Sequence, residues 1–278
     1  MKFADFSDRE SAGEFLRGVG TQAGDRLPIA ETALALAAFG GSGLAVGRYR
    51  DHLDELAAEL AGTPGGLAAA VEALQITLFQ RHGYAGDTET YDDPQNADLM
   101  RVIDRRKGLP VALGILALHL ARAQGWEMVG LALPGHFLVR LEVGGERAIL
   151  DPFNGARRRD AAELRALLRS ATGADNALEP RHYAPVGDRD VLLRLQNNLK
   201  LRYLEAEAPA KALAVLDGMI LIAPELARLR HEAGILHAEL GNYGAATEAL
   251  QRCLDLAGEA GERQRAALLL QKLRLRLN

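Results

Sequence analysis

Apolar residues recur at the spacing of amphipathic helices over residues 3–80, which predicts a layer of helices at the start of the chain. Asp93 and Pro94 then supply an N-cap and a first helical residue for a helix over residues 96–106. Residues 110–125 are apolar nearly all round, a pattern that is typical of a helix buried on most of its sides.

After this helix the period of the pattern changes from 3.6 to 2, and candidate strands lie at residues 128–133, 136–143 and 147–151. Gly144-Gly145 fits a two-residue hairpin loop between the last two strands, because glycine tolerates the positive φ angles of such turns. The sequence therefore predicts a small antiparallel sheet.

The expected hairpin also fixes a register. A two-residue loop pairs Val143 with Glu146 and therefore sets Leu138 opposite Asp151. His136 and Asp151 then share a face as diagonal neighbours, at roughly 7 to 8 Å between backbones, which their side chains can span. An imidazole oriented by a carboxylate is the base-and-orienter half of a nucleophilic triad.

Beyond an expected linker at residues 179–190, the chain repeats itself with a period of 34 residues. The apolar positions Ala212, Leu216, Met219 and Ile220 recur as Ala246, Leu250, Cys253 and Leu254. This is the tetratricopeptide period, and residues 262–277 would form a capping helix. The sequence thus predicts two domains, residues 1–190 and residues 191–278.

Composition narrows the function classes. The 278 residues carry a formal net charge of −4, which is too mildly acidic for a generic binder of nucleic acids or anionic membranes. Cys253 is the only cysteine, so an intrachain disulfide and multi-cysteine metal sites are excluded, and a reducing compartment is favoured. The histidine spacings match no zinc motif, and we expect neither a metal nor a cofactor.

The start of the chain favours a protein that is not exported. Acidic residues stand where a secretory signal would need a basic region followed by an apolar run. The most apolar early stretch, residues 27–39, is far shorter than the roughly 20 residues of a membrane span. We therefore expect a cytoplasmic protein with no membrane segment.

Three sequence segments carry a resemblance to a known family. They are Arg-Lys-Gly-Leu-Pro-Val-Ala-Leu at residues 106–113, Pro-Gly-His-Phe-Leu-Val-Arg at 134–140 and Asp-Pro-Phe-Asn-Gly at 151–155. With them, residues 27–256 resemble the transglutaminase-like superfamily, specifically the SirB-type branch in which this core precedes tetratricopeptide repeats. The resemblance implies an α+β fold that is mostly helical, with a small antiparallel sheet in a papain- or transglutaminase-like core and a C-terminal array of tetratricopeptide helices.

The resemblance also implies a site. The superfamily uses a cysteine at the start of the buried helix, where the helix dipole lowers the thiol pKa, together with a histidine and an aspartate. His136 and Asp151 match the last two, whereas the aligned nucleophile position holds Pro110. Because the attacking thiol is missing there, the sequence favours a protein that is not an enzyme.

Three further residues are candidate ligand-binding positions. Arg140 shares the face of His136 and could bind a carboxylate or phosphate, or it could pair with Glu142 or other acids of the domain. Asn154 could contact a substrate or serve the turn after Asp151. The resemblance adds Asn96, which looks like part of the branch's pattern.

Two function classes follow from these residues. The first is a non-catalytic transglutaminase-like protein whose repeats bind a protein partner, acting as an interaction or regulatory module. The second is a hydrolase or transferase in which His136, oriented by Asp151, acts as general base without a cysteine nucleophile. A small ligand in the vestigial cleft is a further, weaker option.

The alignment of the buried helix can be tested with Pro110→Cys. We expect the new thiol to be alkylated faster than Cys253, because the helix N-terminus and the nearby imidazole lower its pKa. The measurement is the rate of iodoacetamide labelling at each cysteine, read by mass spectrometry. Equal rates at the two thiols would show that the alignment is wrong.

Overall fold

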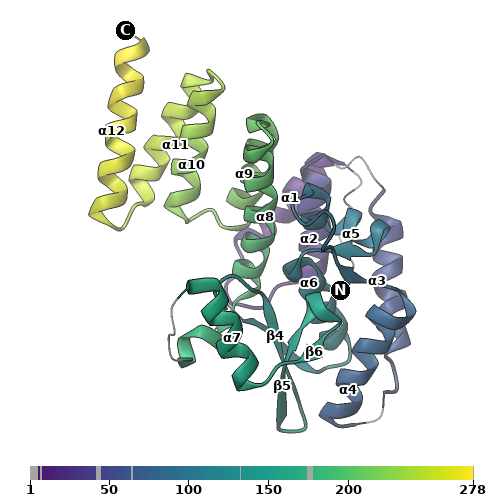
Figure 1. Cartoon of the computed structure of the whole chain (residues 1–278). Helices are drawn as coiled ribbons and strands as arrows, with labels where there is room; N and C mark the ends of the chain where they lie inside the picture. Colours follow the sequence, from purple (N-terminus) through teal and green to yellow (C-terminus); the bar gives the residue numbers. More distant parts are fainter. Residues whose placement is uncertain are drawn as a thin grey trace. The chain divides into compact units, whose positions relative to one another are not determined.

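The computed structural model of the chain describes residues 6, 8–41, 45–63, 65–131, 133–173 and 178–277. They divide into two compact units, which are coloured along the sequence in Figure 1. The core unit comprises Gly24–Ala37 and Gly43–Leu195, and the repeat unit comprises Met1–Ala23, Ala38–Ser42 and Gln196–Asn278.

Helices make up most of the core unit. They are α2 (Ile29–Phe39, whose last residues belong to the repeat unit), α3 (Gly47–Glu59), α4 (Leu67–Leu74), the π-helix η1 (Gln75–Arg81), the 3₁₀-helix η2 (Pro94–Ala97), α5 (Leu99–Arg105), α6 (Pro110–Ala123), the 3₁₀-helix η3 (Pro152–Asn154), α7 (Ala161–Thr172) and the 3₁₀-helix η4 (Pro180–Tyr183). Helix α6 has the pattern expected for it, since it begins at Pro110 and most of its residues are buried.

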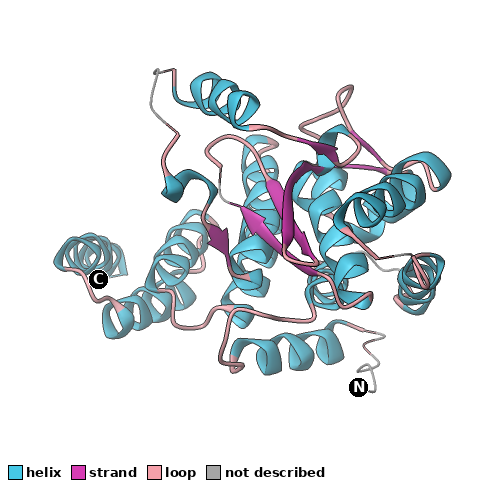
Figure 2. Cartoon of the chain, turned by 90° about the horizontal axis from the view of Figure 1, so that it is seen from below, coloured by secondary structure: helices cyan, strands magenta, loops and turns pink. Residues whose placement is uncertain are grey.

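The strands of the core unit form one five-stranded antiparallel sheet in the order β6-β5-β4-β3-β7 and a short parallel pair (Figure 2). The sheet contains β3 (Glu127–Leu131), β4 (Leu138–Val143), β5 (Glu146–Asp151), β6 (Arg157–Arg158) and β7 (Pro185–Val186), and the pair contains β1 (Ala85–Gly86) and β2 (Lys107–Gly108). The three expected strands are confirmed within a few residues. The four two-residue strands are additions, because segments this short show no periodicity.

Each face of the sheet packs on a different helix. On one face, the ring of Phe137 fills the space left by two glycines, Gly114 of α6 and Gly130 of β3. A Cβ built on Gly114 would lie 2.4 Å from the ring. On the other face, Leu164 of α7 packs in a cluster with Leu131 and Leu138. This packing gives the α+β core that was expected.

The helix expected over residues 96–106 is divided in two. Asp93 caps η2, as its Oδ1 accepts a hydrogen bond from the Gln95 N–H at 2.9 Å. Asp98 then caps α5, and its Oδ1 accepts from the N–H groups of Met100 (2.9 Å) and Arg101 (3.2 Å). The extended backbone of a capping residue interrupts the helix at Asp98, which the apolar spacing did not reveal.

The expected linker at residues 179–190 is more ordered than its two prolines and glycine suggest. It contains η4, the edge strand β7 and the first turn of α8 (Asp188–Glu205). The division between the units falls within α8, between Leu195 and Gln196.

The first described helix, α1 (Arg9–Gly20), belongs to the repeat unit and packs on α9 (Pro209–Ile222), although it precedes the core in sequence.

The repeat unit shows the predicted period directly. Helices α9 and α11 (Tyr243–Leu256) both begin and end 34 residues apart, since 243 − 209 and 256 − 222 each give this value. Leu216 and Leu250 occupy equivalent, fully buried positions. Helix α10 (Ala227–Glu239) lies between them in sequence, and α12 (Ala260–Leu277) is the expected final helix.

Among the described residues, no helix combines the length and the apolar character needed to cross a membrane.

The contact between α1 and α9 can be tested with two glycines of α1. A Cβ on Gly20 would lie 2.1 Å from the backbone oxygen of Leu221, whereas a Cβ on Gly18 would meet nothing within 4 Å. We expect Gly20→Ala to lower the free energy of unfolding by about 1–3 kcal/mol because the backbones must separate. Gly18→Ala should leave it unchanged or raise it by up to about 1 kcal/mol. Urea denaturation followed by circular dichroism measures both, and equal effects would contradict the packing.

Candidate functional site

The hairpin places His136 beside Asp151 as its register predicts. Val143 pairs with Glu146. Gly144 and Gly145 have φ angles of +61° and +82°, as a two-residue loop requires. Nε2 of His136 lies 3.1 Å from Oδ2 of Asp151.

Asp151 is the most heavily bonded side chain of this site. Its carboxylate is fully buried. Its Oδ1 accepts hydrogen bonds from the N–H groups of Phe153 (3.1 Å) and Asn154 (3.3 Å), which caps η3. Its Oδ2 accepts from the side-chain amide of Asn154 at 2.9 Å and from Nε of Arg159 at 3.0 Å, and Nη2 of Arg159 bonds the same oxygen.

These contacts decide the protonation state of Asp151. Burial acts to raise the pKa of the carboxyl, but the close contact with His136 and the hydrogen bonds from Arg159 and Asn154 outweigh it, and the pKa lies well below its ordinary value. The carboxylate is therefore charged at neutral pH. Asn154 occupies the role in the turn that the sequence analysis allowed for it.

His136 is held from two sides. Its side chain is 18% exposed and faces Asp151, while its backbone oxygen accepts a hydrogen bond from Nη2 of Arg194 at 3.0 Å. The guanidinium of Arg194 also lies 5.6 Å from the centre of the Phe137 ring. Nε2 of His136 is close to Asp151 but is not aligned for a good hydrogen bond, because the buried nitrogen meets no acceptor at hydrogen-bonding angles.

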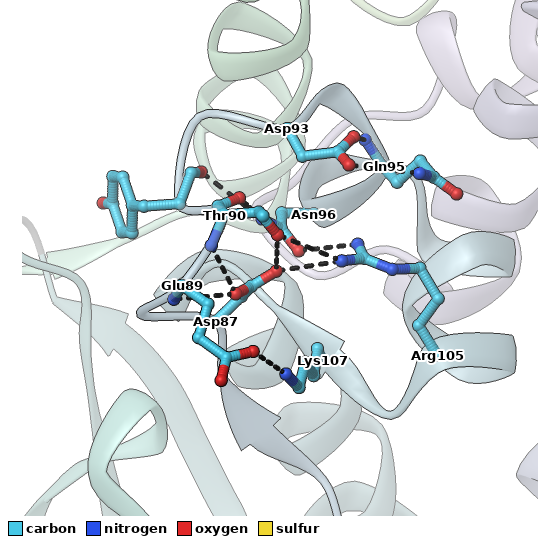
Figure 3. Close-up of polar contacts among 9 residues, drawn as sticks. Asp87, Glu89, Thr90, Asp93, Gln95, Asn96, Arg105 and Lys107 are labelled. Carbon is cyan, nitrogen blue, oxygen red and sulfur yellow. Dashed lines mark hydrogen bonds and ion pairs between the residues drawn. The ribbon is translucent and has the colours of Figure 1, made fainter.

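A second buried aspartate, Asp87, organises the approach to α6 (Figure 3). Its Oδ2 accepts hydrogen bonds from Oγ1 of Thr90 at 2.6 Å and from Nη2 of Arg105 at 2.9 Å. Nη1 of Arg105 donates to Oδ1 of Asn96 at 2.9 Å, and the Asn96 amide donates to the backbone oxygen of Thr90 at 2.6 Å. These four residues are called the Asp87 cluster below.

The Asp87 cluster holds the chain just before α6. The backbone oxygen of Asn96 accepts a hydrogen bond from the N–H of Leu109, the residue before Pro110, at 3.0 Å. The backbone N–H of Asp87 donates to the backbone oxygen of Gly108 at 3.3 Å. Asn96 is fully buried, and both ends of its side-chain amide are bonded within the chain. Sequence reasoning identified Asn96 but missed its partners.

The electrostatics of Asp87 resemble those of Asp151. Burial acts to raise the pKa of Asp87, yet the hydrogen bonds from Thr90, Asn96 and Arg105 outweigh it and hold the pKa well below its ordinary value. Arg105, whose side chain is 25% exposed, therefore faces a buried, charged carboxylate, and such a pair is strong only with its full set of hydrogen bonds.

Arg140 lies near the carboxylate it could pair with. Its Nε is 2.7 Å from Oε1 of Glu142, which is one of the two alternatives that the sequence left open.

Within the described ranges, no group of three or more histidine, cysteine and acidic side chains is placed to hold a metal ion. The thiol of Cys253 is buried in α11, and burial raises its pKa.

Comparisons with known proteins agree with this architecture. Residues 47–197 match the family model of the transglutaminase-like superfamily, and residues 199–271 match a tetratricopeptide repeat model. The chain therefore belongs to the transglutaminase-like superfamily, with tetratricopeptide repeats after the core.

Its relatives define the family more closely. A UPF0162 protein of Pseudomonas aeruginosa is 30% identical over 217 residues, which cover 77% of this chain and 79% of that protein. A UPF0162 protein of Xylella fastidiosa is 35% identical over 188 residues, which cover 66% of this chain and 66% of that protein. The chain belongs to the UPF0162 family, the SirB-like group that the resemblance indicated.

A solved structure is also similar at a distance. It is a crystal structure of menin that reveals the binding site for the Mixed Lineage Leukemia protein. The aligned region covers 96% of this chain and 75% of the menin chain. The TM-score is 0.44 at 12% identity, a level that does not define a shared fold.

The contribution of Asp151 to stability should depend on pH. Asp151→Asn removes the buried charged partner of Arg159 and leaves it only the contact with Glu163 at 3.3 Å, so we expect a loss of about 3 kcal/mol in the free energy of unfolding at neutral pH. Because the folded pKa is below the unfolded value, the wild-type advantage is present above about pH 4 and is lost as the pH falls.

Urea denaturation of both proteins at neutral pH and at about pH 3 measures this effect. The two curves should approach each other in acid. Glu146→Gln, at the exposed end of the same hairpin, is the matched control and should change little at either pH. A difference between wild type and Asp151→Asn that is constant with pH would show that the carboxylate is not ionised in the folded state.

Proposed function

We propose that this protein is a non-catalytic member of the transglutaminase-like superfamily that acts as a protein-interaction or regulatory module. The observation that carries the proposal is the residue at the start of the buried helix α6. Pro110 stands at its first position, where the superfamily has its nucleophilic cysteine. Proline has no side-chain group that can attack a carbonyl, and the thiol of Cys253 is buried in the other unit.

The bonding of Asp151 supports the same proposal. An aspartate that only orients a catalytic histidine would use its carboxylate mainly for that purpose. Here the side chains of Arg159 and Asn154 and two backbone N–H groups share the carboxylate with His136. We infer that the pair has been kept to hold the hairpin and the following turn in place.

The repeat unit offers the binding surface. A cavity of about 780 Å³ lies along α9, α10 and α11 and reaches Arg274 of α12. Residues Arg230, His237 and Thr247 line it, and Nε of Arg230, Nδ1 of His237 and Oγ1 of Thr247 are buried with no hydrogen-bond partner in the part of the chain that the structure describes. Buried polar atoms are normally bonded, so a partner segment with its own polar groups would stabilise this surface.

This cavity, called the groove of the repeats below, is lined by both basic and acidic side chains. Burial lowers the pKa of Arg230, and the nearby charge of Arg252 adds to that effect, whereas burial raises the pKa of Asp217 on the same surface. A partner segment that carries both acidic and basic side chains would complement these charges.

Substitutions in this groove should weaken the binding of the physiological partner. We expect the double variant Arg230→Ser, Arg252→Ser to lose about tenfold or more in affinity, because both guanidinium groups line the groove. The partner is first captured from extracts of the source cells, and its affinity is then measured with purified proteins. Lys272→Ser, an exposed cation of α12 that does not line the groove, is the matched control. Equal affinity of the groove variant and the wild type would contradict the proposal.

The second candidate function is hydrolysis or group transfer with His136 as general base. The observation in its favour is the distance of 3.1 Å between His136 and Asp151 in a partly exposed position. The two functions separate on His136→Gln. If the protein is an interaction module, His136→Gln keeps the partner affinity of the wild type. If it is an enzyme, the wild type hydrolyses activated esters or amides even after iodoacetamide treatment, and His136→Gln loses this activity.

A further inference from the structure

A second cavity lies in the core unit, away from the groove of the repeats. Its volume is about 660 Å³, which is within the range of small-molecule sites. The strands β4, β5 and β6 form one wall, and the start of α7 with Leu178 and Tyr183 forms the other; α7 and these strands are labelled in Figure 1. We call it the arginine pocket because four arginines line it: Arg140, Arg147, Arg158 and Arg159.

Two of the four arginines already have partners. Arg140 lies 2.7 Å from Glu142, and Arg159 bonds Asp151. Arg147 and Arg158 are exposed, and among the described residues neither forms an ion pair or a side-chain hydrogen bond. Arg147 lies opposite Glu142 in the register of β4 and β5, but Glu142 pairs with Arg140, so both guanidinium groups remain available to a ligand.

The two acidic residues of the pocket do not balance these charges. Oδ1 of Asp160 accepts the N–H groups of Ala162 and Glu163, both at 2.8 Å, and so caps α7. Glu163 pairs with Arg157 and, at 3.3 Å, with Arg159, and its Oε2 accepts the N–H of Asp160 at 3.0 Å. Both carboxylates are thus committed to the local structure of the helix start.

The remaining lining is apolar. Ile149, Leu164 and Leu178 belong to the hydrophobic cluster under α7, and Tyr183 packs against the same cluster. Leu164 is buried, while Ile149 and Leu178 keep part of their surface accessible. The pocket therefore combines an aliphatic floor with a cationic rim.

We propose that the arginine pocket binds a small organic anion, in which a carboxylate or phosphate head meets Arg147 and an apolar body lies on Ile149 and Leu178. Arginine forms bidentate hydrogen bonds with both head groups, and these charge-assisted bonds are stronger than neutral ones. The site does not depend on the interaction role of the repeats. It shares Arg159 with the His136 pair, because Arg159 lines the pocket and also bonds Asp151.

Four probes with the same eight-carbon chain test this proposal on the full chain: octanoate, octyl phosphate, octanol and octylamine. Isothermal titration calorimetry and ¹⁵N chemical shifts measure their binding. We expect the two anions to bind and to shift amide signals of β5 and of the start of α7, and the alcohol and the amine to bind at least tenfold more weakly. Whichever anion binds more tightly identifies the natural head group as carboxylate or phosphate.

Variants locate the site. The double variant Arg147→Gln, Arg158→Gln should lower the affinity for the preferred anion by about tenfold or more, since it removes two charged donors. Arg165→Gln, an exposed arginine of α7 outside the pocket, should leave the affinity unchanged. Binding of octanol as tight as that of the anions, or an unchanged affinity in the double variant, would overturn the proposal. Thermal melts of each variant exclude a general loss of folding as the cause.

Discussion

The buried carboxylate of Asp151 joins more of the core unit than any other described side chain of the candidate site. It lies at the end of β5, caps η3 through two backbone N–H groups and bonds Arg159 just before α7. A carboxylate without solvent is stable only when its charge and its lone pairs are satisfied, so each of these segments is fixed relative to the others. His136, at 3.1 Å, is positioned by this arrangement and does not by itself maintain it.

A second buried aspartate, Asp87, uses a similar solution just before the start of the buried helix. Asp87 bonds Thr90 and Arg105 in a buried site, and Asn96 from the same cluster accepts the N–H that precedes Pro110. Both aspartates are ionised despite their burial because hydrogen bonds outweigh the cost of desolvation. The polar groups around α6 thus serve to place it.

The surfaces available for recognition lie elsewhere. Among the described residues, the groove of the repeats contains buried polar atoms that lack hydrogen-bond partners, and the arginine pocket contains two exposed guanidinium groups that form no ion pair. A bound molecule with its own polar groups would satisfy the buried atoms of the groove, and an anion would pair with the guanidinium groups of the pocket. Arg159 belongs to the pocket and to the bonds of Asp151, so that a ligand in the pocket and the state of the His136 pair are physically connected.

The sequence by itself determined the features that depend on local periodicity. The loop Gly144-Gly145 determined the hairpin register because a two-residue turn allows only one pairing, and the 34-residue period determined α9 and α11 because each repeat buries the same positions. Tertiary structure decided the partners of long, flexible side chains, such as Arg105 with Asp87 and Arg159 with Asp151. It also decided that Asp98 interrupts a helix, that residues 185–186 extend the sheet and that α1 packs on α9. These outcomes depend on which groups meet across the fold, and neither spacing nor composition encodes that information locally.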